Sequence, residues 1–227
     1  MKILSIDTSS SAGSIVLAED ENILGEINID SAETHSVRLL NGIDYLFKSL
    51  GLGLSFVDAF AVISGPGSFT GVRIGLTTIK GLAETTAKPI VPLTAFEAWA
   101  EKFPLEQGII VPLIDARRGE VYARVFQRTD GRLSKLSEGM VVIPSQLFSR
   151  LDYEQILFVG GGGSRYRQVV SECGRPLWRI LGSDAFLGRS MARLAYQRAL
   201  KHDFTSALDL KAYYLRKSDA ELYWKER

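Results

Sequence analysis

The stretch AFAVISGPGSFTGVRIG, residues 59–75, contains the pattern that decides the fold class. Residues 59–64 form a short apolar run, which is typical of a strand buried on both faces. Glycines at positions 65, 67 and 71 then predict a loop, and helical spacing of apolar residues follows over residues 72–87. A buried strand that leads through a glycine-rich loop into a helix indicates an α/β fold.

Outward from this stretch, the first half of the chain is predicted to have the order βββαβαβ. Its predicted elements cover residues 2–7, 14–19, 23–30, 34–50, 59–64, 72–87 and 89–93. The second half repeats the order, with strands at 109–115, 120–128, 138–143, 156–159 and 178–181, and helices at 145–151, 164–173 and 184–200. We expect a hairpin turn at 129–131 and N-caps at Ser145 and Ser183.

Two successive βββαβα units predict a duplicated α/β fold in two lobes with a cleft between them. The predicted lobes are residues 1–104, which carry a partner-binding helix, and residues 105–227, whose last helix packs back on the first lobe. Pro104 and Gly108 mark the expected linker.

Composition excludes several protein classes. The chain has 227 residues, of which 46% are hydrophobic and 23% charged, as in ordinary globular proteins. Its longest uncharged stretch, residues 59–72, is shorter than the roughly 20 apolar residues of a membrane span. Asp7 interrupts the first apolar run, so no signal peptide is predicted. The single cysteine, Cys173, excludes an intrachain disulfide. We therefore expect a cytoplasmic protein without membrane contact.

The net charge of +1 is unevenly distributed. Residues 1–104 carry 7 Lys or Arg and 12 Asp or Glu, whereas residues 105–227 carry 20 and 14. The second half therefore has a net charge of +6, which indicates either an anionic partner or a solvated surface with a basic bias.

Three turns carry residues suited to phosphate or magnesium. Asp7, Thr8 and Ser9 follow the first strand, where a carboxylate and small hydroxyl side chains can orient a hydrated metal ion. Asp115 ends the equivalent strand of the second half, although Arg117 and Arg118 replace small residues there. The third turn is rich in glycine and contains Gly161, Gly162 and Gly163. Each turn is also compatible with a purely structural role.

Other catalytic patterns are missing. The loop at residues 64–75 does not have the spacing of a Walker A or Rossmann motif, although its amides suggest an anion nest, with Phe69 as a packing anchor. The two histidines, His35 and His202, form no metal-spaced pair, and there is no Gly-x-Ser-x-Gly elbow. An endopeptidase, a third possible function, therefore has no supporting residues.

Four segments together resemble the TsaB (YeaZ) family over nearly the whole chain. They are the opening residues 2–10, the glycine loop 65–75, the run DARRGEVY at 115–122 and the closing Tyr-Leu-Arg at 214–216. The resemblance implies an actin-like ATPase fold (ASKHA, RNase H-like). It also implies a role in making threonylcarbamoyladenosine next to the anticodon of tRNAs that read ANN codons.

The family resemblance further implies that this chain is a non-catalytic subunit. The transferase of that system is the paralogue TsaD, which binds metal through a His-x-x-x-His pair. The best register places Ala95 and Trp99 at those positions, and neither can bind a metal ion. The implied partners are TsaD, TsaE, tRNA through the complex, and a second copy of the chain when TsaD is absent.

The helix predicted at residues 34–50 is the expected partner surface. Its apolar residues lie on more than one face, which exceeds what a core stripe requires. The predicted interface residues are Val37, Leu39, Leu40, Ile43, Leu46 and Phe47.

The alternative function is a small-molecule kinase or ATPase that uses the three turns. For the family member, no cofactor is expected to be required. Weak binding of ATP or ADP with magnesium at a complex interface is compatible with the turns that remain.

Overall fold

The computed structural model describes residues 1–30, 35–161, 166–173, 175–181 and 185–216, with side chains from residue 38 onward in the first helix. The chain forms two compact units. The first contains Met1–Ala98 and Phe186–Tyr213, and the second contains Trp99–Ala185 and the segment that begins at Tyr214.

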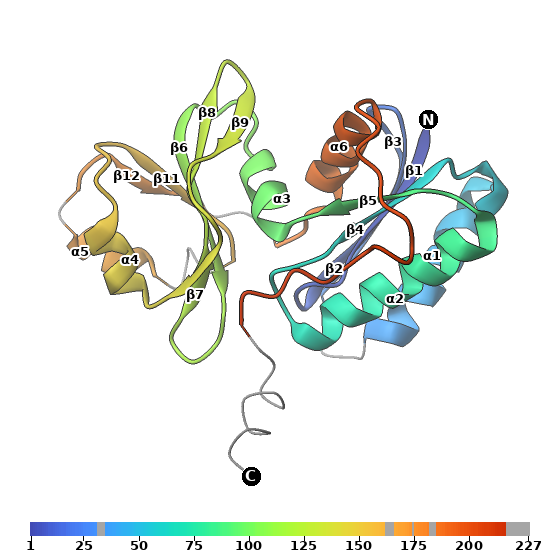
Figure 1. The fold of residues 1–227 in the computed structure, drawn as a ribbon, viewed down its shortest axis with the longest axis horizontal. Helices are drawn as coiled ribbons and strands as arrows, with labels where there is room; N and C mark the ends of the chain where they lie inside the picture. Colours follow the sequence, from blue (N-terminus) through green and yellow to red (C-terminus); the bar gives the residue numbers. More distant parts are fainter. Residues whose placement is uncertain (31–34, 162–165, 174, 182–184, 217–227) are drawn as a thin grey trace, which may run out of the picture. The chain divides into compact units, whose positions relative to one another are not determined.

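The first unit is built on a five-stranded sheet in the order β3-β2-β1-β4-β5 (Figure 1). The strands are β1 (Lys2–Asp7), β2 (Ala12–Glu19), β3 (Asn22–Asp30), β4 (Ala59–Ile63) and β5 (Ile90–Leu93). β1, β4 and β5 run parallel, whereas β2 is antiparallel to β1 and β3. Helices α1 (His35–Leu50) and α2 (Phe69–Thr86) cover one face and α6 (Gly188–Ala199) covers the other.

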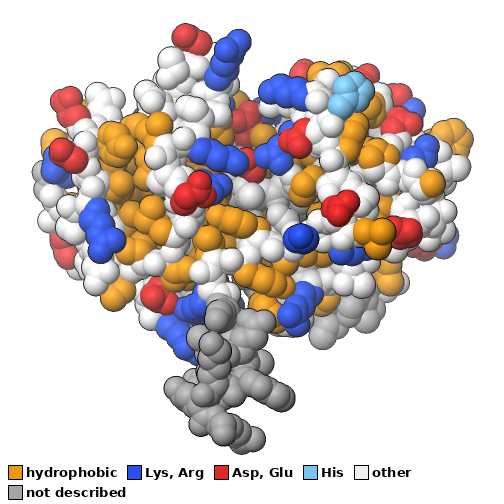
Figure 2. All heavy atoms as spheres, in the orientation of Figure 1, with side chains coloured by type: hydrophobic (Ala, Val, Ile, Leu, Met, Phe, Trp, Pro, Cys, Tyr) orange, Lys and Arg blue, Asp and Glu red, His pale blue; other side chains and the backbone are white. Residues whose placement is uncertain are grey.

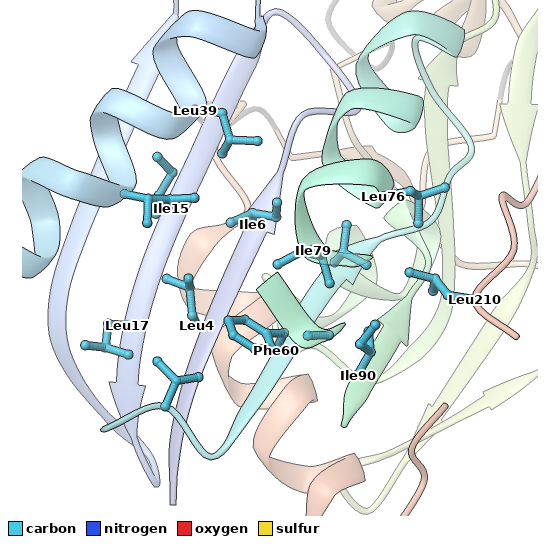
Figure 3. Close-up of a cluster of buried hydrophobic side chains, with 14 of the residues drawn as sticks. Leu4, Ile6, Ile15, Leu17, Leu39, Phe60, Leu76, Ile79, Ile90 and Leu210 are labelled. Atoms are coloured by element: carbon cyan, nitrogen blue, oxygen red, sulfur yellow. The ribbon is translucent and has the colours of Figure 1, made fainter. Parts of the chain in front are cut away.

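The core of the first unit lies between the sheet and the pair α1 and α2. Alternate residues of a strand point to opposite faces, so Leu4 and Ile6 of β1 point into this core, together with Ile15 and Leu17 of β2 (Figure 3). Ser5 and Asp7 therefore lie on the face that α6 covers. This alternation places a buried carboxylate at the end of β1.

The second unit repeats the strand order and directions of the first. Its central sheet has the order β10-β7-β6-β11-β12, with β6, β11 and β12 parallel and β7 antiparallel to both of its neighbours. The strands are β6 (Gly108–Asp115), β7 (Val121–Ala123), β8 (Phe126–Thr129), β9 (Arg132–Lys135), β10 (Met140–Val142), β11 (Ile156–Val159) and β12 (Trp178–Ile180). Its helices are α4 (Pro144–Arg150) and α5 (Arg167–Glu172). The predicted duplication is confirmed.

In the second unit, one predicted strand is broken in two and one observed strand was not predicted. The strand predicted at 120–128 is broken into β7 and β8, because the Val125 N–H donates to Ser137 Oγ at 2.9 Å and its carbonyl accepts from Leu136. β8 then forms a hairpin with β9 through the expected turn at 129–131. β9 was not predicted, since three of its four residues are exposed and it has no apolar alternation.

The predicted helix caps also differ. α4 begins at Pro144 with Ile143 as N-cap, so Ser145 lies inside the helix and makes no cap. α6 begins at Gly188 with Leu187 as N-cap, and Ser183 lies outside the described residues. α5 begins at Arg167, later than predicted.

The first unit is discontinuous in sequence, in contrast to the predicted division into 1–104 and 105–227. The cause is α6, whose buried face consists mainly of small side chains, so that the helix lies close to β1 and β2. Ala192 packs against Val16 and Ala18 of β2. Helix α3 (Ala95–Glu101) spans the boundary between the units.

Candidate functional site

Asp7 is almost fully buried, with 1% of its surface exposed. Its Oδ1 accepts a hydrogen bond from the Ser9 N–H at 2.8 Å, whereas its Oδ2 has no hydrogen-bond partner among the described residues. Burial raises the pKa of the Asp7 carboxyl, and the hydrogen bonds from Ser9 oppose this shift. Asp7 is therefore a buried acid at the start of a turn.

The glycine loop between β4 and α2 packs directly on this turn. The Thr8 hydroxyl donates to the Gly71 carbonyl at 2.7 Å, and the Ser68 N–H donates to the Ser9 carbonyl at 2.7 Å. A Cβ atom on Gly71 would lie 1.9 Å from the Thr8 oxygen, and one on Gly67 would lie 2.3 Å from the Ser9 oxygen. The glycines thus permit close contact between two segments of the backbone.

This packing uses two of the amides for which an anion nest was expected in the loop. The Ser68 N–H is bonded to Ser9, and the Gly71 N–H donates to Ser68 Oγ, which is the N-cap of α2. These amides are therefore satisfied within the chain. Phe69 is half-buried at the start of α2, where the Arg73 guanidinium stacks 3.8 Å from the centre of its ring, and its predicted role as a packing anchor stays a prediction.

A hollow of about 20 Å³ lies beside Asp7, and its lining is mostly apolar: it consists of Thr8, Gly13, Ser14, Ile15, Ile27, Ile29, Arg38 and Leu39. This is about the volume that one water molecule requires. A drug-sized or nucleotide-sized ligand needs a pocket of about 300 Å³ or more. The hollow therefore fits water near Asp7 and does not fit a nucleotide with magnesium.

Asp115 occupies the equivalent turn of the second unit. Its Oδ1 accepts from the Arg117 N–H at 2.8 Å, which is the same contact, at the same spacing, as that of Asp7 with Ser9. Asp115 is only partly buried. Asp7 and Asp115 belong to different units. That they face each other across a cleft therefore stays a prediction.

The third predicted turn is described only in part. Gly160 has φ of 113°, and a Cβ atom there would lie 2.4 Å from the Leu113 carbonyl oxygen. The backbone conformation and this close contact therefore both require glycine at position 160. Gly161 is exposed, and a Cβ atom there would meet nothing within 4 Å. Gly162 and Gly163 lie outside the described residues, and their predicted role stays a prediction.

The structure corrects most of the predicted partner surface on α1. Leu39, Ile43, Leu46 and Phe47 are each at most 6% exposed and belong to the core of the first unit. Figure 3 shows Leu39 directed toward the sheet. The side chain of Val37 lies outside the described part of the chain. These four buried residues face the sheet and are not available to a partner.

Among the described side chains of α1, the large apolar residues that are exposed are Leu40 and Tyr45, at 57% and 67%. Leu40 was among the predicted interface residues, whereas Tyr45 was counted as apolar but left out of them. Helical spacing would have separated both from the core stripe, because residues 39, 43, 46 and 50 follow one face and positions 40 and 45 lie off it. On α2, the exposed residues include Thr70, Arg73 and Thr77.

Three comparisons with known proteins place the chain in a family. It is 30% identical over its full length to the tRNA threonylcarbamoyladenosine biosynthesis protein TsaB of Bacillus subtilis, of which it covers 99%. It is 34% identical to the protein of the same name from Haemophilus influenzae, of which it covers 97%. The chain belongs to the TsaB family.

Structural comparison supports this assignment. YeaZ from Pseudomonas aeruginosa is 27% identical and superposes with a TM-score of 0.82, over 94% of this chain and 99% of that one. Residues 23–203 also match the family described as TsaD, tRNA N6-adenosine threonylcarbamoyltransferase. A ROK hexokinase from Thermus thermophilus, with 13% identity and a TM-score of 0.52, shares only the fold. The predicted actin-like fold is confirmed.

In this TsaB family member, Ala95 and Trp99 occupy the two positions where the sequence register with TsaD predicts histidines. Both positions lie in α3. Ala95 and Trp99 are buried, with 1% and 6% exposed, and neither side chain offers a metal-binding atom. Between them, Glu97 accepts from Thr94 Oγ1 at 2.6 Å and from Arg198 at 2.7 Å. The described part of α3 therefore has a structural role.

The described residues contain no group of three or more His, Cys, Asp or Glu side chains placed to hold a metal ion. None of the described helices has the length and apolar character needed to cross a membrane.

Proposed function

We propose that this chain takes part in the biosynthesis of threonylcarbamoyladenosine in tRNA. The observation that carries the proposal is its full-length similarity, at 30–34% identity, to proteins of that name. The modified base would be the adenosine next to the anticodon in tRNAs that read ANN codons. The proposed location is the cytoplasm, where such tRNAs function.

The proposed contribution of the chain is contact rather than catalysis. It would act as scaffold and activator for TsaD, with TsaE joining the complex. Two observations support this role: Ala95 and Trp99 carry no metal-binding atoms, and the hollow beside Asp7 has room for about one water. The alternative, a small-molecule kinase, would need an accessible Asp7, which is 1% exposed.

We further propose that the chain requires no nucleotide of its own. Contact with ATP or ADP and magnesium would then be weak and confined to an interface within the complex. The internal hydrogen bonds of Thr8 and Ser9 support this proposal, because these groups already have partners within the chain.

The exposed face of α1 is the proposed contact with TsaD, or with a second copy of the chain when TsaD is absent. Leu40 and Tyr45 provide its apolar area. Large apolar side chains at the centre of an interface commonly contribute most of its binding energy.

The test replaces both residues in one variant, Leu40→Arg with Tyr45→Arg. We expect it to keep its circular dichroism spectrum, to lose about 2 kcal/mol of binding energy for TsaD, and to lose tRNA modification in proportion. Binding is measured by calorimetry with purified TsaD, and modification by mass spectrometry of tRNA nucleosides.

The matched control is Phe56→Arg. Phe56 belongs to the first unit, lies outside α1 and α2, and is 55% exposed, so this variant also adds a charge at an exposed apolar residue. This control should bind TsaD as the parent does. Equal binding by the double variant and the parent would contradict the proposed surface.

A further inference from the structure

The β6–β7 hairpin holds two adjacent exposed arginines in a left-handed backbone. Arg117 has φ of 64°, Arg118 of 54° and Gly119 of 78°. The Glu120 N–H donates to the Arg117 carbonyl at 3.0 Å, so Arg118 and Gly119 are the central residues of a tight turn. Asparagine or glycine is the usual residue at such positions, and arginine is strained there. Strain of this kind is often retained for a function.

The hairpin is fixed by contacts at its base. Asp115 accepts from the Arg117 N–H, and the Ala116 N–H donates to the Glu120 carbonyl at 3.0 Å. Arg216 donates from Nη1 to Glu120 Oε2 at 2.7 Å and from Nη2 to the Ala116 carbonyl at 2.8 Å. The backbone that presents the two arginines is therefore preorganised.

The charged side chains at the hairpin and its base include more arginines than acids. The Glu120 carboxylate is paired with Arg216, and Asp115 is the other acid of the turn. Three arginines thus accompany two acids at the hairpin and its base. Elsewhere, on the face shown in Figure 2, lysine and arginine side chains are interspersed with acidic ones.

We propose that the β6–β7 hairpin is a tRNA contact in which the guanidinium groups of Arg117 and Arg118 bind backbone phosphates. The proposal rests on the proposed function, which makes tRNA the substrate of the complex. A guanidinium presents a planar set of donors that matches phosphate oxygens, and a fixed turn loses little freedom on binding.

A polyanion fits these observations better than a protein carboxylate does. A carboxylate pairs with one guanidinium, whereas this turn presents two adjacent ones. RNA presents phosphates in series, which two adjacent guanidinium groups can contact together.

The test is the variant Arg117→Asn with Arg118→Asn, in the full chain assembled with TsaD. Asparagine tolerates the left-handed backbone, so the unfolding temperature should not fall. We expect the Kd for tRNA to rise about tenfold. The slope of log K against log salt should become shallower by about 1 for each arginine removed.

The matched control is Arg132→Gln with Lys135→Gln, which removes two exposed positive charges from β9 of the same unit. Its tRNA affinity should stay close to that of the parent. Equal affinity and slope for the Arg117 and Arg118 variant would overturn the proposal, as would loss of TsaD binding with unchanged tRNA affinity. Failure of the proposed function is a separate result, in which the parent chain itself leaves tRNA modification unchanged.

Discussion

At the scale of single residues, two acids show what the sequence predicted and what it did not. Asp7 and Asp115 were identified from their places at the ends of equivalent strands, and they make the same contact to the amide two residues later. Their burial was not predicted, because it depends on segments distant in sequence. Asp7 is buried by folding and leaves one oxygen without a partner among the described residues, whereas Asp115 is partly exposed.

The first prediction concerns the stability of an Asp7→Asn variant. The folded-state pKa of Asp7 lies above its ordinary value, so this carboxyl stabilises the fold only at low pH and destabilises it as the pH rises through the folded pKa. We expect Asn to increase the free energy of unfolding by about 1–2 kcal/mol at pH 7. The gain should shrink on acidification. Urea unfolding between pH 4 and pH 8 measures it.

The control for this prediction is Asp115→Asn, at the equivalent but partly exposed position. It should show a smaller dependence on pH. A loss of stability in Asp7→Asn at pH 7 would contradict the raised pKa.

At the scale of elements, the segment at residues 59–75 was correctly predicted as strand, loop and helix, yet the purpose of its glycines was not. The sequence shows that glycines are present but not which atoms lie opposite them. In the fold, they allow the loop to lie on the Thr8–Ser9 turn. The spacing of apolar residues likewise predicted α1 and its core stripe, but the predicted interface combined residues of that stripe with residues off it, so Leu39 and Leu40 were assigned to one surface although only Leu40 is exposed.

The second prediction tests the role of these glycines with two substitutions in α2. Gly71→Ala places a Cβ atom 1.9 Å from the Thr8 carbonyl oxygen, which is a backbone atom that cannot easily move. We expect a loss of about 2–3 kcal/mol in the free energy of unfolding. Gly81→Ala, in the same helix, meets nothing within 4 Å and should stabilise the protein by about 0.5–1 kcal/mol. Chemical denaturation measures both, and a neutral Gly71→Ala would contradict the close contact.

At the scale of the whole molecule, the duplication was predictable because each half repeats one order of strands and helices. The packing of the last helix, α6, on the first unit was also predicted, whereas the residues that make this contact were not. Its small buried residues fit the sheet formed by β1 and β2, and this match involves residues more than 150 positions apart. The break between β7 and β8 escaped prediction because Val125 forms hydrogen bonds with residues 136 and 137, which lie beyond the strand predicted at 120–128.

The central claim is that this chain supports tRNA modification through contact, without chemistry of its own. The direct measurement is the rate of threonylcarbamoyladenosine formation in a reconstituted system with TsaD and TsaE. It compares the parent chain, no chain and the Asp7→Asn variant. We predict that modification requires the chain and proceeds equally with the Asp7→Asn variant. Full-rate modification without the chain, or loss of modification with an Asp7→Asn variant that still binds TsaD, would contradict the account.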